Sequence, residues 1–129
     1  MGDLSVKHFL PAVAALTLTA ATSLAAQSAP APDGAALFRT RCASCHTVTP
    51  GARTTVGPNL SGVVGRKAAS TSFNYSTALK ASNITWTRAN LERFLSGPAR
   101  MVPGTRMVIA VSDSGQRAAL LNFLARPTR

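Results

Sequence analysis

Acidic side chains are scarce in this chain of 129 residues, which has four aspartates and glutamates against fourteen lysines and arginines and a formal net charge of +10 at pH 7. The basic residues are scattered rather than gathered into runs, which argues against a nucleic-acid-binding tail. A surface of this kind favours attraction to an acidic protein partner, with an association rate that falls as salt rises. A generally soluble basic surface, or incidental affinity for anionic membranes, is the alternative.

Cysteine is also rare. The two cysteines, Cys42 and Cys45, stand three residues apart and are followed directly by His46. This C-x-x-C-H pattern is typical of covalent attachment of a c-type haem, because two thiols about one helical turn apart can add to the vinyl groups of one porphyrin. A strained disulfide, a thioredoxin-like redox pair and a zinc site are the alternatives. The flanking residues offer no strand–helix–strand context for the redox pair, and zinc would lack a fourth Cys or His ligand downstream.

Large aromatic residues make up only 5% of the sequence. A mature chain of roughly a hundred residues is too small to build an extensive apolar core of its own. A covalently held macrocycle would supply the missing hydrophobic centre. We therefore expect the apoprotein to be unfolded or molten.

The sequence predicts one domain behind a leader. Residues 1–26 are typical of a signal peptide, because Lys7 and His8 precede an apolar run over 9–24 and small residues follow it. An uncleaved membrane anchor is the alternative, although the run is short for a bilayer span and contains Pro11. We expect cleavage and a periplasmic location, with a flexible lead-in at 27–32 and the domain at 33–129.

Four helices are predicted from caps and apolar spacing. The first begins after Asp33 and is expected to continue its buried face through both cysteines. The others are expected at 76–81, from Thr87 to the Gly97–Pro98 stop, and from Asp113 or Ser114 to a point before Pro127. Gly34 weakens the first helix, a cost that a close crossing by another backbone would offset.

The axial ligands of such a haem can be sought by elimination. His46 is the only histidine outside the leader, so two histidines cannot ligate the iron within the mature chain. Met101 and Met107 are the remaining soft donors, and Met107 is preferred because the preceding Pro103–Gly104–Thr105 turn gives it a stiff approach. With both axial positions filled, the pattern favours electron transfer over catalysis.

Two further elements bear on the same site. The Pro58 carbonyl is free to accept a hydrogen bond from Nδ1–H of His46, which would fix the histidine tautomer. Tyr75 and Trp86 need hydrogen-bond partners if they are buried, and a haem propionate or a core carbonyl could serve.

Taken together, residues from about Gly34 to Leu124 resemble the class I c-type cytochromes, the soluble mitochondrial and bacterial cytochrome c group. The resemblance is carried, in chain order, by Gly34 and Phe38, Cys42-x-x-Cys45-His46, Gly57-Pro58-Asn59-Leu60, Gly65-Arg66-Lys67, Phe73-Asn74-Tyr75, Ile84-Thr85-Trp86, Pro103-Gly104-Thr105-Arg106-Met107, and Leu120 with Phe123.

The resemblance implies an all-α fold of four to five helices around one covalent haem c, with the first and last helices crossing at Gly34 against Leu120 and Phe123. It implies His46 and Met107 as iron ligands, with Pro58 behind the histidine. The inner propionate would be surrounded by Arg66, Tyr75 and Trp86, with Thr105 nearby.

Family members are monomeric one-electron carriers rather than enzymes, and they shuttle between membrane complexes, from a cytochrome bc complex to an oxidase or a photosynthetic reaction centre. An electron-transfer subunit of a periplasmic dehydrogenase, or an N-terminally anchored cytochrome c, is the alternative. Three departures limit the carry-over of detail: Phe94 replaces a tyrosine, Leu79 replaces an asparagine, and arginine replaces much of the lysine docking ring.

Overall fold

The computed structural model describes residue 2 and residues 28–54 and 56–126. The predicted signal peptide, residues 1–26, lies outside this range apart from Gly2. The described chain forms five helices: α1 (Gly34–Arg41), α2 (Thr77–Ala81), α3 (Arg88–Ser96), α4 (Pro98–Met101) and α5 (Ser114–Leu124). It contains no strand, only an isolated antiparallel bridge between Lys67 and Thr85. The predicted all-α class is confirmed.

Four of the helices begin with a side chain that caps the first turn. Each cap accepts a hydrogen bond of 2.7–3.1 Å from a backbone N–H two or three residues ahead, which satisfies a donor with no partner inside the helix. Asp33 and Thr87 are the caps predicted from the sequence, and Asp113 is one of the two residues expected to open the last helix. Ser76, predicted as the first residue of its helix, is instead the cap of α2. The short helix α4 was not predicted. It has no side-chain cap and begins instead with Pro98, whose fixed φ suits the first position of a helix.

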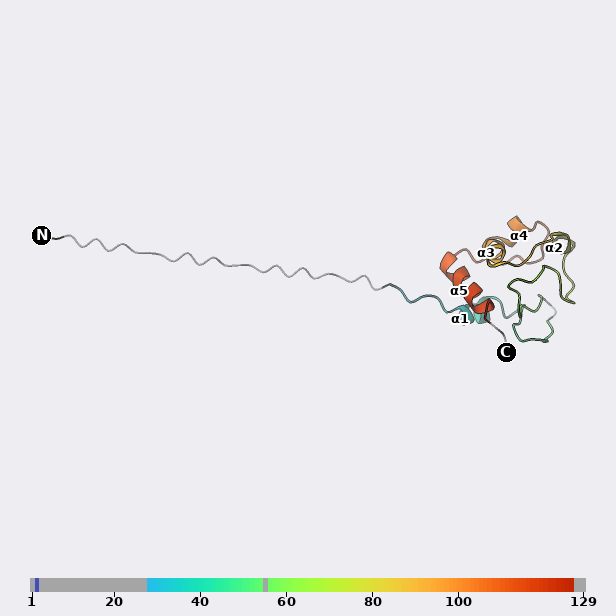
Figure 1. Ribbon diagram of the computed structural model, residues 1–129, viewed down its shortest axis with the longest axis horizontal. Helices are drawn as coiled ribbons and strands as arrows, with labels where there is room; N and C mark the ends of the chain where they lie inside the picture. The colour runs from blue at the N-terminus through green and yellow to red at the C-terminus, as the bar shows by residue number, and fades with distance from the viewer. Residues whose placement is uncertain (1, 3–27, 55, 127–129) are drawn as a thin grey trace.

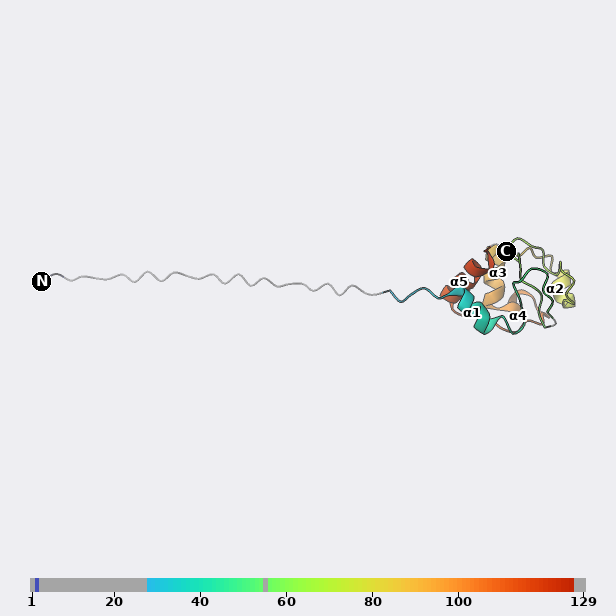
Figure 2. The same cartoon turned by 90° about the horizontal axis from the view of Figure 1, so that it is seen from below.

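The terminal helices cross at Gly34. Figures 1 and 2 both place α1 against α5. A Cβ built on Gly34 would lie 2.1 Å from the Ala119 carbonyl oxygen and 3.0 Å from Cβ of Phe123, so only glycine fits. Next to the crossing, the rings of Phe38 and Phe123 are in contact, with centroids 5.3 Å apart. The predicted crossing is confirmed, with Ala119 rather than Leu120 supplying the backbone that approaches Gly34.

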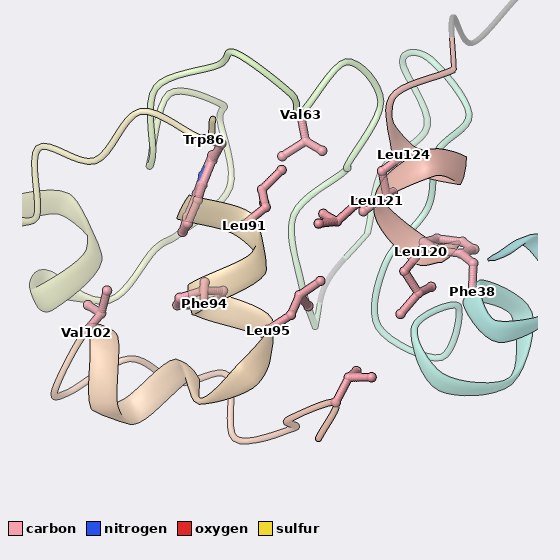
Figure 3. Close-up of a cluster of buried hydrophobic side chains, with 11 residues drawn as sticks. Phe38, Val63, Trp86, Leu91, Phe94, Leu95, Val102, Leu120, Leu121 and Leu124 are labelled. Atoms are coloured by element: carbon pink, nitrogen blue, oxygen red, sulfur yellow. The ribbon is translucent and has the colours of Figure 1, made fainter. Parts of the chain in front are cut away.

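The apolar core is built mainly from α3 and α5, which pack together. On α3 the buried side chains recur at three- and four-residue spacing, which places them on one face of the helix. Figure 3 shows Leu91 and Leu95 of α3 pointing toward the side on which Leu121 of α5 lies. Trp86 precedes α3, and its ring meets that of Phe94 with centroids 4.9 Å apart. The core therefore lies beside the segments that carry the predicted site.

The first helix is shorter than predicted. It ends at Arg41, and Cys42 is its C-cap, so Cys45 does not continue the helix. The N–H groups of Cys42 and Ala43 both bond to the Phe38 carbonyl at 2.9 Å, and the chain then turns through Cys45. The C-x-x-C-H motif is therefore a turn on the end of α1.

None of the helices within residues 28–54 and 56–126 combines the length and apolar character that a bilayer span requires.

Candidate functional site

A cavity of about 620 Å³ opens beside the core. Its size is within the range of cofactor sites, roughly 300–1,000 Å³. Leu91 and Leu95 of α3 and Leu120 and Leu124 of α5 line it with apolar side chains. All the site residues predicted from the sequence lie around this one cavity: Cys42, Cys45, His46, Pro58, Arg66, Tyr75, Trp86, Thr105 and Met107.

The two thiols lie at the wall of the cavity in the turn after α1. Both cysteines are half-buried and free, so no disulfide joins them. The N–H groups of Cys45 and His46 both bond to the Cys42 carbonyl, at 3.0 and 2.9 Å. This turn brings the two cysteines and His46 together at the cavity wall.

The electrostatic setting of Cys42 favours the neutral thiol. Burial raises the pKa of Cys42, the positive charge of Arg41 lowers it, and the neighbouring Cys45 raises it again, with burial the largest effect. A thiol with a raised pKa is a weaker nucleophile toward disulfides at neutral pH. This setting argues against a redox-active pair.

His46 is oriented by its own loop. Its Nδ1 lies 2.7 Å from the Pro58 carbonyl oxygen, and because a carbonyl can only accept, Nδ1 carries the proton and Nε2 keeps its lone pair. A Cβ at Gly57 would lie 2.5 Å from Cε1 of His46, so the backbone packs directly on the imidazole ring. The Gly57 N–H bonds to the Cys45 carbonyl at 3.0 Å, which ties this loop to the motif.

The two methionines of the described chain occupy different places. Met107 lines the cavity, whereas Met101 lines a separate, more open groove beside α2, α3 and α4. The approach to Met107 is a turn in which Gly104 adopts φ +91° and the Thr105 N–H bonds to the Val102 carbonyl at 3.0 Å. Of the two thioethers, Met107 is thus the one available to a group in the cavity.

Arg66, Tyr75 and Thr105 have hydrogen-bond partners within the protein. The Arg66 guanidinium donates to the carbonyls of Ser61 and Asn59, at 2.8 and 2.9 Å. The Tyr75 hydroxyl pairs with the Thr71 hydroxyl at 2.6 Å, a partner that the sequence did not suggest. The Oγ1 of Thr105 accepts a long hydrogen bond, 3.4 Å, from the Met107 N–H, which links this residue to the methionine.

Sequence reasoning missed part of the rim. The sequence analysis assigned no role to Val56, Val108 or Ile109, yet all three line the cavity and are strongly exposed, Val108 to 79%. Arg41 and Arg106 line it as well. A lone valine in a polar loop, and two apolar residues directly after the ligand candidate, are the signals that could have found the apolar members.

The alternatives to haem find no support in the described residues. These contain no strand for a thioredoxin-like unit and no cluster of three or more His, Cys, Asp or Glu side chains suited to zinc. A large apolar cavity edged by two free thiols and an oriented imidazole fits a flat hydrophobic macrocycle attached by thioether bonds.

Comparison with known proteins decides the family. Residues 31–126 match the family model Cytochrome c. The chain belongs to the cytochrome c family. It is 44% identical over 92 residues to cytochrome c of Theileria annulata, covering 70% of this chain and 80% of the relative. It is 45% identical over 87 residues to cytochrome c2 of Rhodomicrobium vannielii, covering 66% and 70%.

Among solved structures, cytochrome cH from Methylobacterium extorquens is similar, with a TM-score of 0.66 and 36% identity over 72% of this chain and 97% of that one. Within the cytochrome c family this chain is a class I c-type cytochrome. Its cofactor is haem c, attached covalently through Cys42 and Cys45. Members of the family are electron carriers.

Proposed function

We propose that this cytochrome carries single electrons with its haem iron ligated by His46 and Met107. The observation that carries the proposal is that both side chains line the one cavity that also receives the two thiols. Bound haem c supplies an iron that changes its charge by one electron. His46 and Met107 would both hold the iron and would leave it no position for a substrate, so we propose a carrier rather than an enzyme.

Each proposed ligand is prepared by the protein. The Pro58 carbonyl holds the His46 ring in the tautomer that presents Nε2 as a donor. The Met107 thioether is a weak neutral donor, so it must be held close to the iron. The turn over 103–105 restricts the motion of the backbone that leads to it. Met/His ligation raises the reduction potential, which suits transfer to a terminal acceptor.

The charge distribution supports an acidic docking partner. The acidic residues of the described chain have internal uses: Asp33 and Asp113 cap helices, and Glu92 pairs with Arg117. Most of the arginines therefore remain without a compensating charge. We propose that acidic surfaces of a cytochrome bc complex, an oxidase or a reaction centre attract this basic carrier in the periplasm.

The cavity rim offers the contact itself. Val56, Val108 and Ile109 present exposed apolar surface next to Arg41 and Arg106. An apolar contact surrounded by charges suits transient docking. The charges raise the rate of encounter, and the apolar contact dissociates readily. We propose that the partner contacts this rim and that the carrier docks as a monomer.

Substitution of each methionine tests the ligation. Met107→Ala is expected to lose the methionine–iron charge-transfer band of the ferric protein and to bind added imidazole. Met101→Leu is the matched control, since it removes the other thioether from the groove outside the cavity, and its spectrum should equal that of the unchanged protein. If Met107→Ala keeps the band, the proposed ligand is wrong.

A further inference from the structure

Arg117 of α5 lies outside the cavity, and its side chain makes three hydrogen bonds. Its Nη1 donates to the carbonyls of Val111 and Ser112, at 2.8 and 2.7 Å. Its Nε donates to the Glu92 carboxylate of α3 at 2.5 Å. The side chain is only 13% exposed, and this is the single ion pair of the described residues. One guanidinium thus joins two helices to a loop.

The loop that Arg117 holds is the continuation of the Met107 segment. After Met107 come three exposed residues, Val108 to Ala110, for which residues 28–54 and 56–126 provide no hydrogen bond. The next residue, Val111, is buried, and its N–H donates a hydrogen bond to the Leu95 carbonyl at 2.8 Å. On the C-terminal side of Met107, Val111 is thus the first residue that a hydrogen bond ties to the rest of the described chain.

On the N-terminal side the segment is held by the turn before it and by Arg106, which donates to the Asn74 carbonyl. A thioether is a weak ligand, so its bond to iron depends on how little the segment can move. The two ends of the segment thus share the task of keeping the sulfur in place.

We propose that Arg117 and Glu92 form a brace that positions Met107 for the iron. Arg117 is a positioning residue, acting through the Val111 and Ser112 carbonyls, and Glu92 fixes the guanidinium that makes both bonds. This inference rests on the proposed ligation by Met107 and adds to it the part of the protein that maintains the ligand.

The chemistry of the guanidinium explains why arginine is needed. Its planar fork presents several N–H donors at fixed angles, so it can serve two adjacent carbonyls and a carboxylate at once. A lysine ammonium is a point charge on a flexible stem and does not reproduce this arrangement. The guanidinium is only 13% exposed, so the Glu92 carboxylate offsets part of the cost of withdrawing this cation from water.

The chain contains a matched control. Arg88 also joins α3 to α5, donating to the Asn122 side chain at 2.6 Å and to the Ala118 carbonyl at 3.4 Å. Among the described residues, no hydrogen bond joins the Arg88 side chain to the 107–113 segment. Arg88→Lys therefore weakens a link between the same two helices while leaving the Met107 segment untouched.

The experiment compares ferric Arg117→Lys and Arg88→Lys holoprotein by imidazole titration and by the methionine–iron charge-transfer band. Loss of charged hydrogen bonds that hold the segment should make Arg117→Lys bind imidazole about tenfold more tightly and reduce its band. Arg88→Lys should stay within about twofold of the unchanged protein, as expected of a surface substitution. Glu92→Gln, which keeps the side-chain volume, should shift both readouts in the same direction by a smaller factor.

Denaturant midpoints of all the variants separate positioning from general stability. If Arg117→Lys and Arg88→Lys change imidazole affinity equally, or if Arg117→Lys lowers only the midpoint, the brace is refuted. Should Arg117→Lys fail to fold, Glu92→Gln against Arg88→Lys decides the question on the same two readouts. Failure of the ligation itself is recognised separately, because Met107→Ala would then retain the band.

Discussion

Substituting Gly57 by alanine should disturb His46 specifically. Gly57 is buried, and its φ is outside the left-handed range, so the added methyl group creates no backbone strain. The new Cβ would lie 2.5 Å from Cε1 and 2.8 Å from Nδ1 of His46, whereas ordinary van der Waals contact begins near 3.4 Å. The ring would have to retreat by about 0.9 Å, the difference between 3.4 and 2.5 Å. This movement is large compared with the tolerance of the 2.7 Å bond to Pro58.

Two quantities should change. Overpacking of a filled site costs about 1–3 kcal/mol, so the free energy of unfolding should fall by that amount. Weakening the bond to the Pro58 carbonyl makes the imidazole a poorer donor, which favours the ferrous over the ferric iron. A threefold change in that preference raises the reduction potential by about 30 mV, given about 59 mV for each factor of ten in a one-electron couple.

The assay is redox titration together with denaturant unfolding, with Gly62→Ala as the control. A Cβ at Gly62 meets nothing within 4 Å, but the residue has φ +65°, so alanine there costs about 1–2 kcal/mol through backbone strain alone. Gly62→Ala should therefore lose stability with an unchanged potential. If Gly57→Ala shows the same potential as Gly62→Ala, or a lowered one, the proposed role of the Pro58–His46 contact is refuted.

Two further predictions concern the fold and the surface. Gly34→Ala should lower the free energy of unfolding by about 2–3 kcal/mol, because its Cβ would lie 2.1 Å from the Ala119 carbonyl oxygen and the helices would have to separate; an unchanged denaturant midpoint would contradict the crossing. The rate of electron transfer to an acidic redox partner should fall steeply as ionic strength rises, because the basic surface steers the encounter. Stopped-flow absorbance measures this rate, and a rate that does not change with salt would refute electrostatic steering.

Much of the fold followed from local chemistry. Asp33 and Thr87 marked the starts of two helices, and the start of the last helix was narrowed to Asp113 or Ser114, because a capping oxygen satisfies a backbone donor two or three residues ahead in its own turn. The C-x-x-C-H motif indicated its cofactor in the same way, since the two thiols and the imidazole are neighbours in the chain. Gly34 indicated a close helix crossing, because glycine destabilises a helix relative to alanine and its presence therefore needs a reason outside the helix.

Other features had no signature in the sequence pattern. The end of α1 at Arg41 is decided by a turn that brings two N–H groups onto one carbonyl, and helical periodicity does not report such a turn. The hydroxyl pair of Thr71 and Tyr75, and the choice of Ala119 as the backbone facing Gly34, likewise have no local signature.

The sequence by itself determined the kind of cofactor and the preference for Met107 over Met101, because motif spacing and turn composition are properties of short segments, and the all-α class followed from the family resemblance. Only the tertiary structure placed Met107 at the cavity and Met101 outside it, exposed the apolar rim at Val108, and brought Arg117 onto the Met107 segment. The reason is physical: these relations are fixed by how helices pack, and packing joins residues whose separation along the chain carries no information about their distance in space.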